Sequence, residues 1–305
     1  MKAIRIHEYG DAGTLKLEEI PRLSIADDQV LVRVHDAGVN PIDWKIREGF
    51  MKQVMPVNFP LTIGQDFAGE VTERGKAAGE FNIGDRVFGF AQGTYAEYAA
   101  APTSTVARIP DSIDYATAAA LPTAGSTALQ LVRDVAQVRP GITLLIHGAA
   151  GGVGSFATQI AKKLGARVIG TASGEDVEYL KSLSVDQVID YKKERFEEKV
   201  KEPDVVIDLV GGDTLAHSYP VLKKGGILVT TVQPVDEQAA KKAGIRALMM
   251  IMQRKAADLA ELARLVAEGA IKPRLGHTMS LSQAKQAQEM SETGKTRGKV
   301  ILEVA

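Results

Sequence analysis

Cysteine is absent from the 305 residues of this chain. Its absence excludes disulfide bonds, a catalytic thiol and any metal site built on thiolates. Histidine is scarce, and its five positions show no metal-ligand spacing: His7, His35, His147, His217 and His277. We interpret His147, which ends a predicted strand, as a structural residue. We therefore predict no metal site, and a zinc enzyme is disfavoured.

A surplus of one charge and long apolar runs are also absent. The chain carries 37 Lys and Arg against 38 Asp and Glu, so its net charge of −1 offers no electrostatic basis for binding nucleic acid or an anionic membrane. No apolar run approaches the roughly 20 residues that span a bilayer. The opening residues, MKAIRIHEYGDAG, lack the apolar core of a signal peptide, and we expect a cytoplasmic protein.

What is present indicates a globular protein of two domains, with 45% hydrophobic and 25% charged residues. The first hundred residues contain short β-type runs separated by Gly, Pro and Asp. These runs are Lys2–Glu8, Gln29–Val39, Gly69–Glu73, Arg86–Phe90 and Tyr95–Ala99. Helical patterns follow at 116–121 and 124–135.

From Thr143 onward, strand and helix patterns alternate, which predicts a parallel sheet covered on both faces. Six strands are expected, as in doubly wound dinucleotide-binding sheets. They lie at 143–147, 166–171, 187–190, 204–210, 226–232 and 245–252. Helices are expected at 152–164, 175–183, 194–200, 213–222 and 256–268. The end of the chain reads as strand, helix and strand at 271–279, 281–292 and 298–304.

A glycine-rich turn joins the first two strands of this alternating region. Its pattern is A-x-G-x-x-G, with Ala149 where a first glycine is usual. Gly151 and Gly154 allow close backbone approach, and the following helix offers unpaired N–H groups to a pyrophosphate. The flanking strand, helix and strand make dinucleotide binding the favoured interpretation. The expected contacts are Gly148, Ala149, Gly151, Gly152, Val153 and Gly154.

Several motifs in order give the chain a family resemblance. They are AGVNPIDWKIREG (37–49), PLTIGQDFAGEV (60–71), GDRVFGF (84–90), LPTAGSTALQ (121–130), HGAAGGVGSFATQIAKKLGA (147–166) and TRGKVILEV (296–304). The whole chain resembles the zinc-free quinone oxidoreductase and enone reductase branch of the medium-chain dehydrogenase/reductase superfamily.

This resemblance implies an α/β fold with two domains and an active-site cleft between them. A β-rich GroES-like substrate domain would comprise 1–113 and 270–305. A doubly wound Rossmann domain that binds the nicotinamide cofactor would comprise 114–269.

The resemblance also bears on zinc. Zinc alcohol dehydrogenases carry a cysteine ligand where this chain has Asn40, and a histidine ligand where it has Gln65. Neither Asn nor Gln is a usual ligand of catalytic zinc. The chain therefore resembles the zinc-free members.

The second strand of the alternating region bears on the choice of cofactor. An acid at its end, which would bind the ribose hydroxyls of NAD, is missing from the Gly170–Ser173 segment. The hydroxyls of Thr171 and Ser173 are expected to favour the 2′-phosphate of NADPH. Relatives often carry a lysine where this chain has Val177, and the 192–195 segment is an alternative source of charge. Acidic residues at 175 and 176 would make the preference for NADPH modest.

Further cofactor contacts are implied by matching positions in the family. Tyr191 resembles a tyrosine that packs beside the adenosine phosphate, and Lys299 resembles a lysine near the cofactor. The remaining positions are Thr123, Thr127, Val210, Gly211, Thr231 and Gln233. For the threonines, helix capping or core hydrogen bonding is an open alternative.

Hydride transfer needs groups that stabilise the negative charge on the acceptor oxygen. Asn40 and Lys45 are the candidate catalytic residues, because both lie on a segment that lines the family's substrate cleft. Asn40 has an alternative role in fixing the turn before Pro41, and Lys45 has one as a solvated surface residue. We expect Asp43 to hold the local loop rather than act as an acid. Trp44 is either a wall for a flat substrate or a core residue.

The resemblance thus implies an NADPH-dependent oxidoreductase that reduces quinones or α,β-unsaturated carbonyls without zinc. Two alternatives stay open: a zinc-free reductase of aldehydes or ketones, and a crystallin-like NADPH-binding protein with little turnover. Relatives commonly dimerise by joining sheet edges. We therefore predict a homodimer, with 227–232 and 245–252 as candidate interface strands.

Overall fold

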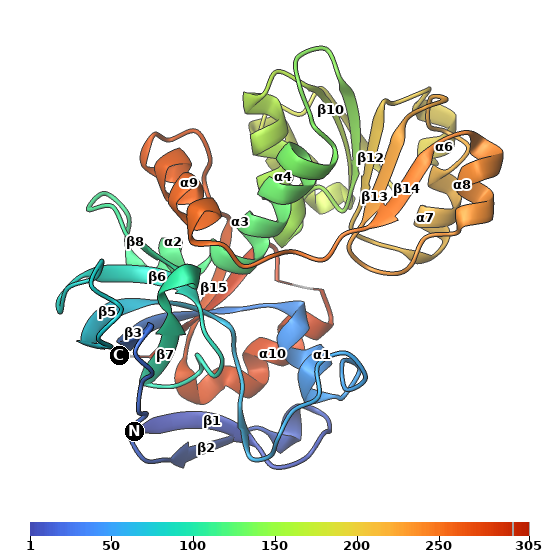
Figure 1. Cartoon of the computed structure of the whole chain (residues 1–305). Coiled ribbons are helices and arrows are strands. Elements are labelled where there is room, and N and C mark those ends of the chain that lie inside the picture. Colours follow the sequence, from blue (N-terminus) through green and yellow to red (C-terminus); the bar gives the residue numbers. More distant parts are fainter. Residues whose placement is uncertain (295, 305) are drawn as a thin grey trace. The chain divides into compact units, whose positions relative to one another are not determined.

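The structure, a computed structural model, describes residues 1–294 and 296–304 (Figure 1). These residues form two compact units. Unit 1 comprises Met1–Ser126, Arg254–Gly269 and the segment from Pro273 onward, and unit 2 comprises Thr127–Gln253 and Ala270–Lys272. Among these residues, no helix is long and apolar enough to cross a membrane.

Unit 2 contains a six-stranded parallel sheet in the order β11-β10-β9-β12-β13-β14. Figure 1 labels its strands β10, β12, β13 and β14. Numbered from β9, this is the 3-2-1-4-5-6 order of doubly wound dinucleotide-binding folds. The prediction of six parallel strands is confirmed. The strands are β9 (Thr143–His147), β10 (Arg167–Ala172), β11 (Gln187–Asp190), β12 (Val205–Asp208), β13 (Ile227–Thr230) and β14 (Arg246–Met249).

Both faces of this sheet are buried, as the unbroken apolar strands predict. Leu145 packs in a core cluster with side chains of α6, α7 and α8. Its neighbours Leu144 and Ile146 point to the opposite face and are also fully buried. The helices of the unit are α4 (Gly152–Lys163), α5 (Val177–Ser182), α6 (Phe196–Lys199), α7 (Gly212–Ser218) and α8 (Glu237–Ala243).

The strand order corrects one prediction about dimer contacts. The segment 227–232 contains β13, which is hydrogen-bonded to β12 on one side and β14 on the other. Its backbone groups are already paired, so it offers no free edge to a partner, and its selection as an interface strand is wrong. Of the two candidate segments, only 245–252, which contains β14, lies at an edge of this sheet.

Unit 1 is β-rich, as predicted. A seven-stranded sheet runs β15-β16-β3-β5-β6-β8 with β7 also paired to β3, and a three-stranded sheet runs β2-β1-β4. The strands are β1 (Lys2–Ile6), β2 (Lys16–Glu19), β3 (Gln29–Val39), β4 (Leu61–Thr62), β5 (Asp66–Arg74), β6 (Arg86–Phe90), β7 (Tyr98–Pro102), β8 (Val106–Arg108), β15 (Leu275–Ser280) and β16 (Lys299–Glu303).

The helices of unit 1 are α1 (Pro41–Arg47), α2 (Tyr115–Ala119), α9 (Ala256–Ala267) and α10 (Ala284–Glu292). Helix α3 (Pro122–Leu129) begins in unit 1 and ends in unit 2, where a π-helix (Gln130–Val135) continues it. The unit bounds thus differ from the predicted division at 113/114 and 269/270, because α2 packs on β3 and β5 and α9 packs on β8. The division into a substrate and a cofactor domain stays a prediction.

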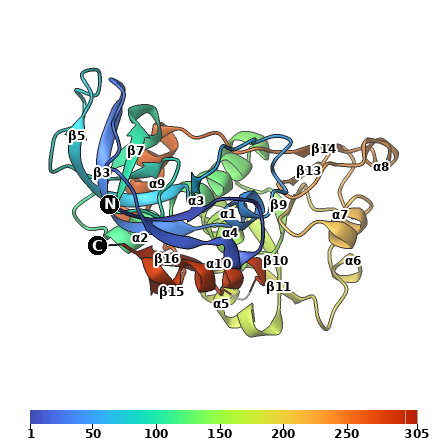
Figure 2. The same cartoon turned by 90° about the horizontal axis from the view of Figure 1, so that it is seen from below.

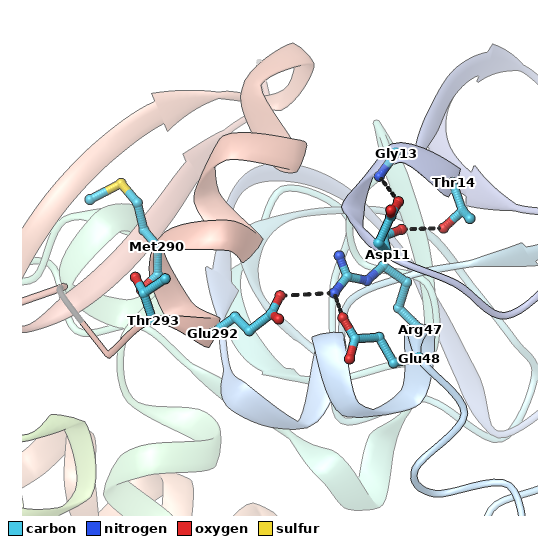
Figure 3. Close-up of polar contacts among 8 residues, drawn as sticks. All are labelled: Asp11, Gly13, Thr14, Arg47, Glu48, Met290, Glu292 and Thr293. Atoms are coloured by element: carbon cyan, nitrogen blue, oxygen red, sulfur yellow. Dashed lines mark hydrogen bonds and ion pairs between the residues drawn. The ribbon is translucent and has the colours of Figure 1, made fainter.

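A buried arginine joins α1 to α10, which lie side by side in both views (Figures 1 and 2). The Arg47 side chain is fully buried, and its Nη2 donates to Glu48 at 2.5 Å and to Glu292 at 3.2 Å (Figure 3). Its carbonyl oxygen accepts from Gly10 N at 3.0 Å, beside the turn that Asp11 stabilises. These contacts hold the carboxyl end of α1, the helix that carries several candidate site residues.

Candidate functional site

The carboxyl ends of the unit 2 strands bring together most of the predicted cofactor contacts. The glycine turn follows β9, Thr171 and Ser173 lie at the end of β10, and Tyr191 follows β11. Val210 and Gly211 follow β12, and the Thr231–Gln233 segment follows β13. All strands of a parallel sheet end at one edge, and β9 lies between β10 and β12 where the strand order reverses. This is the place where open α/β sheets bind ligands.

The glycine turn has a geometry that excludes side chains at specific points. Gly148 has a φ of 71°, in the left-handed region that favours glycine. A Cβ built on Gly154 would lie 2.1 Å from the Gly148 carbonyl oxygen, so the first turn of α4 packs directly on the loop. Gly151 is the N-cap of α4, and the N–H groups that follow it have no acceptor within the helix. The turn therefore fits a pyrophosphate at the helix N-terminus.

Thr171 supports this turn from within the sheet. Its carbonyl oxygen accepts from Ala149 N at 3.1 Å, and its Oγ1 accepts from Gly148 N at 3.4 Å. The residue is only 4% exposed. The structure thus assigns Thr171 a role in holding the loop, and direct contact with a cofactor stays a prediction.

His147 takes part in the same buried contacts. Its Nδ1 lies 3.2 Å from Thr171 Oγ1 and its Nε2 lies 3.1 Å from Ser218 Oγ. Burial lowers the pKa of His147 to about 4, so the ring is neutral at physiological pH. This agrees with its interpretation as a structural residue at a strand end.

The segment after β10 combines a hydroxyl with acidic neighbours. Ser173 is half-buried, and its Oγ donates to Asp176 Oδ2 at 3.4 Å. Glu175 and Asp176 both lie in the short turn that follows. Tyr191 is 60% exposed at the end of β11, where it is available to pack against a ligand. The contact of Ser173 with a 2′-phosphate stays a prediction.

An aspartate that the sequence interpretation missed organises the ends of β12 and β13. The buried Asp208 carboxylate accepts from the N–H groups of Val210 at 3.2 Å and Gly211 at 3.0 Å. Gln233 Oε1 accepts from Gly212 N at 3.0 Å. The signal in the sequence was an aspartate at the end of an apolar strand, three residues before the first glycine of the Gly211-Gly212 pair. Of the remaining predicted contacts in unit 2, Thr231 is half-buried and Thr127 is buried.

A second group of predicted residues forms a buried polar network within unit 1. Lys299 Nζ donates to the Val39 carbonyl oxygen at 2.9 Å and to Asn40 Oδ1. Asn40 Nδ2 donates to Asp66 Oδ2 at 2.8 Å. Thr123 donates to the same carboxylate through its Oγ1 at 2.6 Å and its N at 3.0 Å. The network therefore joins β3, β5, β16 and the start of α3.

The charges of this network depend on one another. Burial raises the pKa of Asp66, and the nearby Lys299 ammonium opposes the shift. Burial lowers the pKa of Lys299, and Asp66 and Asp43 oppose that shift. Asn40 is 2% exposed and its amide group is held between the two charged residues. The structure thus supports the alternative role of Asn40 in fixing the turn before α1, and its role in catalysis stays a prediction.

A cavity of about 250 Å³ lies within unit 1 beside α1. Its wall is mainly apolar and includes Ile46, Val57 and Leu61. Two polar residues on it, Gln65 and Arg254, are hydrogen-bonded to each other. Such a combination of apolar walls and a few placed polar groups is typical of ligand sites. The sequence interpretation missed Arg254, which lies far from the other wall residues along the chain.

The remaining candidates lie on and after α1. Lys45 is half-buried, and its Nζ lies 5.7 Å from the centre of the Trp44 ring. Trp44 makes an edge contact with Phe50, which is 69% exposed. Lys45 and Asn40 are not part of the cavity wall. Among residues 1–294 and 296–304, no group of three or more His, Asp or Glu side chains could hold a metal ion.

Comparisons with known proteins agree with this architecture. The family model described as "Alcohol dehydrogenase GroES-like domain" matches residues 26–111, and the one described as "Zinc-binding dehydrogenase" matches residues 183–302. The chain is 32% identical to the quinone oxidoreductase of Mus musculus, over 99% of this chain and 97% of the relative.

Two solved structures are similar over nearly the full length. The quinone oxidoreductase from Coxiella burnetii has a TM-score of 0.92 and 38% identity, with 100% of this chain and 99% of that chain covered. The quinone oxidoreductase of Escherichia coli, solved in complex with NADPH, has a TM-score of 0.91 and 29% identity, with 99% of this chain and 100% of that chain covered.

Proposed function

We propose, because the chain belongs to the quinone oxidoreductase branch of the medium-chain dehydrogenase/reductase superfamily, that it reduces quinones or α,β-unsaturated carbonyls with NADPH. The observation that carries the proposal is the glycine turn at the point where the strand order of unit 2 reverses. Relatives that cover nearly the whole chain are quinone oxidoreductases, and one was solved with NADPH. We also propose a cytoplasmic homodimer that pairs through the edge strand β14.

Each part of the unit 2 edge has a role toward the cofactor. The turn 148–154 and the α4 N-terminus would hold the pyrophosphate, and Ser173 would hold the 2′-phosphate. The hydride donor is the bound dihydronicotinamide. In this proposal no zinc takes part, and Lys45 stabilises the charge that develops on the acceptor oxygen.

The proposal is tested by mixing the purified protein with NADPH and a panel of quinones, enones and simple aldehydes. Loss of NADPH absorbance with quinones or enones is the expected result. Turnover of aldehydes alone would favour an alcohol dehydrogenase-like reductase. NADPH binding without turnover of any acceptor would favour a crystallin-like role and contradict the proposal.

Exchanging Ser173 for aspartate is expected to weaken NADPH binding more than about tenfold relative to NADH binding. A carboxylate there would repel the 2′-phosphate, and like charges near a protein surface cost a few kcal/mol. Fluorescence titration with both cofactors gives the two dissociation constants. Ser182→Asp, at an exposed serine of α5, is the control for added charge. Equal loss of both affinities would remove Ser173 from the phosphate site.

Lys45→Ala is expected to lower kcat/KM for enones more than tenfold, which corresponds to at least about 1.4 kcal/mol of transition-state stabilisation. Removing this cation takes away one positive charge proposed to stabilise the developing enolate. Steady-state kinetics at saturating NADPH give the comparison. Lys52→Ala, at an exposed lysine after α1, is the matched control. An unchanged rate in the Lys45 variant would make Lys45 a surface residue.

A further inference from the structure

A single carboxyl group forms part of the wall of the unit 1 cavity. Asp43, on α1, is 1% exposed and lines this cavity together with mainly apolar side chains. A buried carboxyl group beside a ligand-sized cavity is uncommon, because burial of a charged group is costly unless it is paired. The hydrogen-bond partners of both Asp43 oxygens therefore matter.

The hydrogen bonds of Asp43 are confined to one oxygen. Its Oδ2 accepts from Asn40 N at 2.8 Å and from Tyr95 OH at 2.9 Å. Its Oδ1 is buried and has no hydrogen-bond partner among the residues that the structure describes. Two donors on Oδ2 favour a proton on Oδ1 when the group is neutral, because a protonated oxygen accepts poorly. The proton would then lie on the oxygen that no protein group uses.

The groups around Asp43 keep this proton near neutral pH. Burial is the main cause that raises the pKa of Asp43 to about 7, and the Asp66 carboxylate on β5 adds to it. The hydrogen bonds from Asn40 and Tyr95 and the Lys299 ammonium on β16 oppose the shift. Asp43 is thus a mixture of acid and carboxylate at physiological pH, which suits a group that donates a proton and recovers it.

We propose that Asp43, which the sequence led us to expect as a loop-holding residue rather than an acid, is the acid that protonates the reduced acceptor in this cavity. The inference rests on the proposed function and adds the proton donor and the place where the acceptor carbonyl binds. A hydride from NADPH adds two electrons and one hydrogen to the quinone or enone and leaves NADP⁺ and an acceptor anion. The Asp43 O–H bond breaks, and its proton goes to that anion. The resulting Asp43 carboxylate takes a proton from water that enters the cavity.

The second polar feature of the wall agrees with this assignment. Arg254 donates to Gln65 Oε1, and its guanidinium lies 5.4 Å from the centre of the Phe90 ring. These two contacts orient a permanent cation at the cavity. A cation there attracts the oxygen on which negative charge develops, so the acceptor would be held with its carbonyl toward the polar part of the wall.

Asp43→Asn tests the inference, because asparagine matches the shape of the protonated acid but cannot transfer its proton. In the wild type, the acid form is lost as pH rises through about 7, so kcat/KM for a quinone is expected to fall above that pH. In the variant, kcat/KM at pH 6 is expected to drop at least about tenfold and to lose this alkaline decrease. NADPH affinity and the urea unfolding midpoint at pH 6 are expected to stay unchanged.

Tyr95→Phe provides a second measurement if the asparagine variant folds poorly. It removes a hydrogen bond that lowers the pKa of Asp43, so the alkaline decrease is expected to move to higher pH. A wild-type profile without this decrease, or the same profile in either variant, would overturn the role of Asp43 while leaving NADPH-dependent turnover intact. No turnover by the wild type with any acceptor would instead overturn the proposed function and this inference together.

Discussion

Replacing Lys299 by methionine is expected to lower the free energy of unfolding by about 3–5 kcal/mol, the usual cost of removing one partner from a buried charge pair. Lys299 is 5% exposed. Its positive charge opposes the rise that burial causes in the pKa values of Asp66 and Asp43. Methionine has a similar volume but leaves these carboxyl groups without a cation. The loss is expected to be smaller at low pH, because both carboxyl groups have raised pKa values and become neutral there.

Urea denaturation at pH 8 and pH 5 measures both effects. Lys285→Met, at an exposed lysine of α10, is the control for the substitution itself. Combining Lys299→Met with Asp66→Asn is expected to restore part of the lost stability, because it removes the unpaired charge while the amide oxygen still accepts from Thr123 N. A decrease in the free energy of unfolding of less than about 1 kcal/mol for Lys299→Met at pH 8, as seen for exposed ion pairs, would show that the network carries little net charge.

Gly154→Ala is expected to weaken NADPH binding at least about a hundredfold, or roughly 2.7 kcal/mol. The added Cβ would lie 2.1 Å from the Gly148 carbonyl oxygen and 2.8 Å from Ala149 Cα, both of them backbone atoms. The loop and the first turn of α4 would have to separate, and the N–H groups would no longer converge on the pyrophosphate. Calorimetric titration with NADPH measures the loss, and the thermal midpoint is expected to fall as well.

Gly151→Ala is the control for crowding within the protein. It adds a methyl group to the same turn at a position where that group meets few protein atoms. The φ of Gly151 is −72°, and its Cβ would meet only the Gly148 carbonyl oxygen at 3.3 Å. We expect this variant to keep the wild-type thermal midpoint. Wild-type NADPH affinity and stability in the Gly154 variant would contradict the role of the turn.

Local patterns predicted the sheet of unit 2 closely. The first strand, Thr143–His147, and the third, Gln187–Asp190, have the predicted ends. Both follow from apolar runs bounded by turn residues, which depend only on near neighbours in the chain. The glycine turn followed from the same local information, because its residues are consecutive.

The short elements of unit 1 were harder to predict. Helix α1 was not predicted, because its seven residues carry too little periodicity. The strand expected at Tyr95–Ala99 lies instead at Tyr98–Pro102, because Ala96 forms an isolated bridge to Ala3 on another sheet, where the Tyr95 carbonyl accepts from Ile4 N. Such pairings join residues far apart in sequence, which periodicity does not report.

The sequence by itself determined the doubly wound sheet, the position of the glycine turn and the family, because each depends on consecutive residues or on motifs in a fixed order. Only the tertiary structure decided that Lys299 is buried against Asn40 rather than free at a surface, and that Asp43 lines a cavity with Arg254. The physical reason is that burial sets the cost of a charge and the accessibility of a proton. Burial is a property of residues that meet only when the chain is folded.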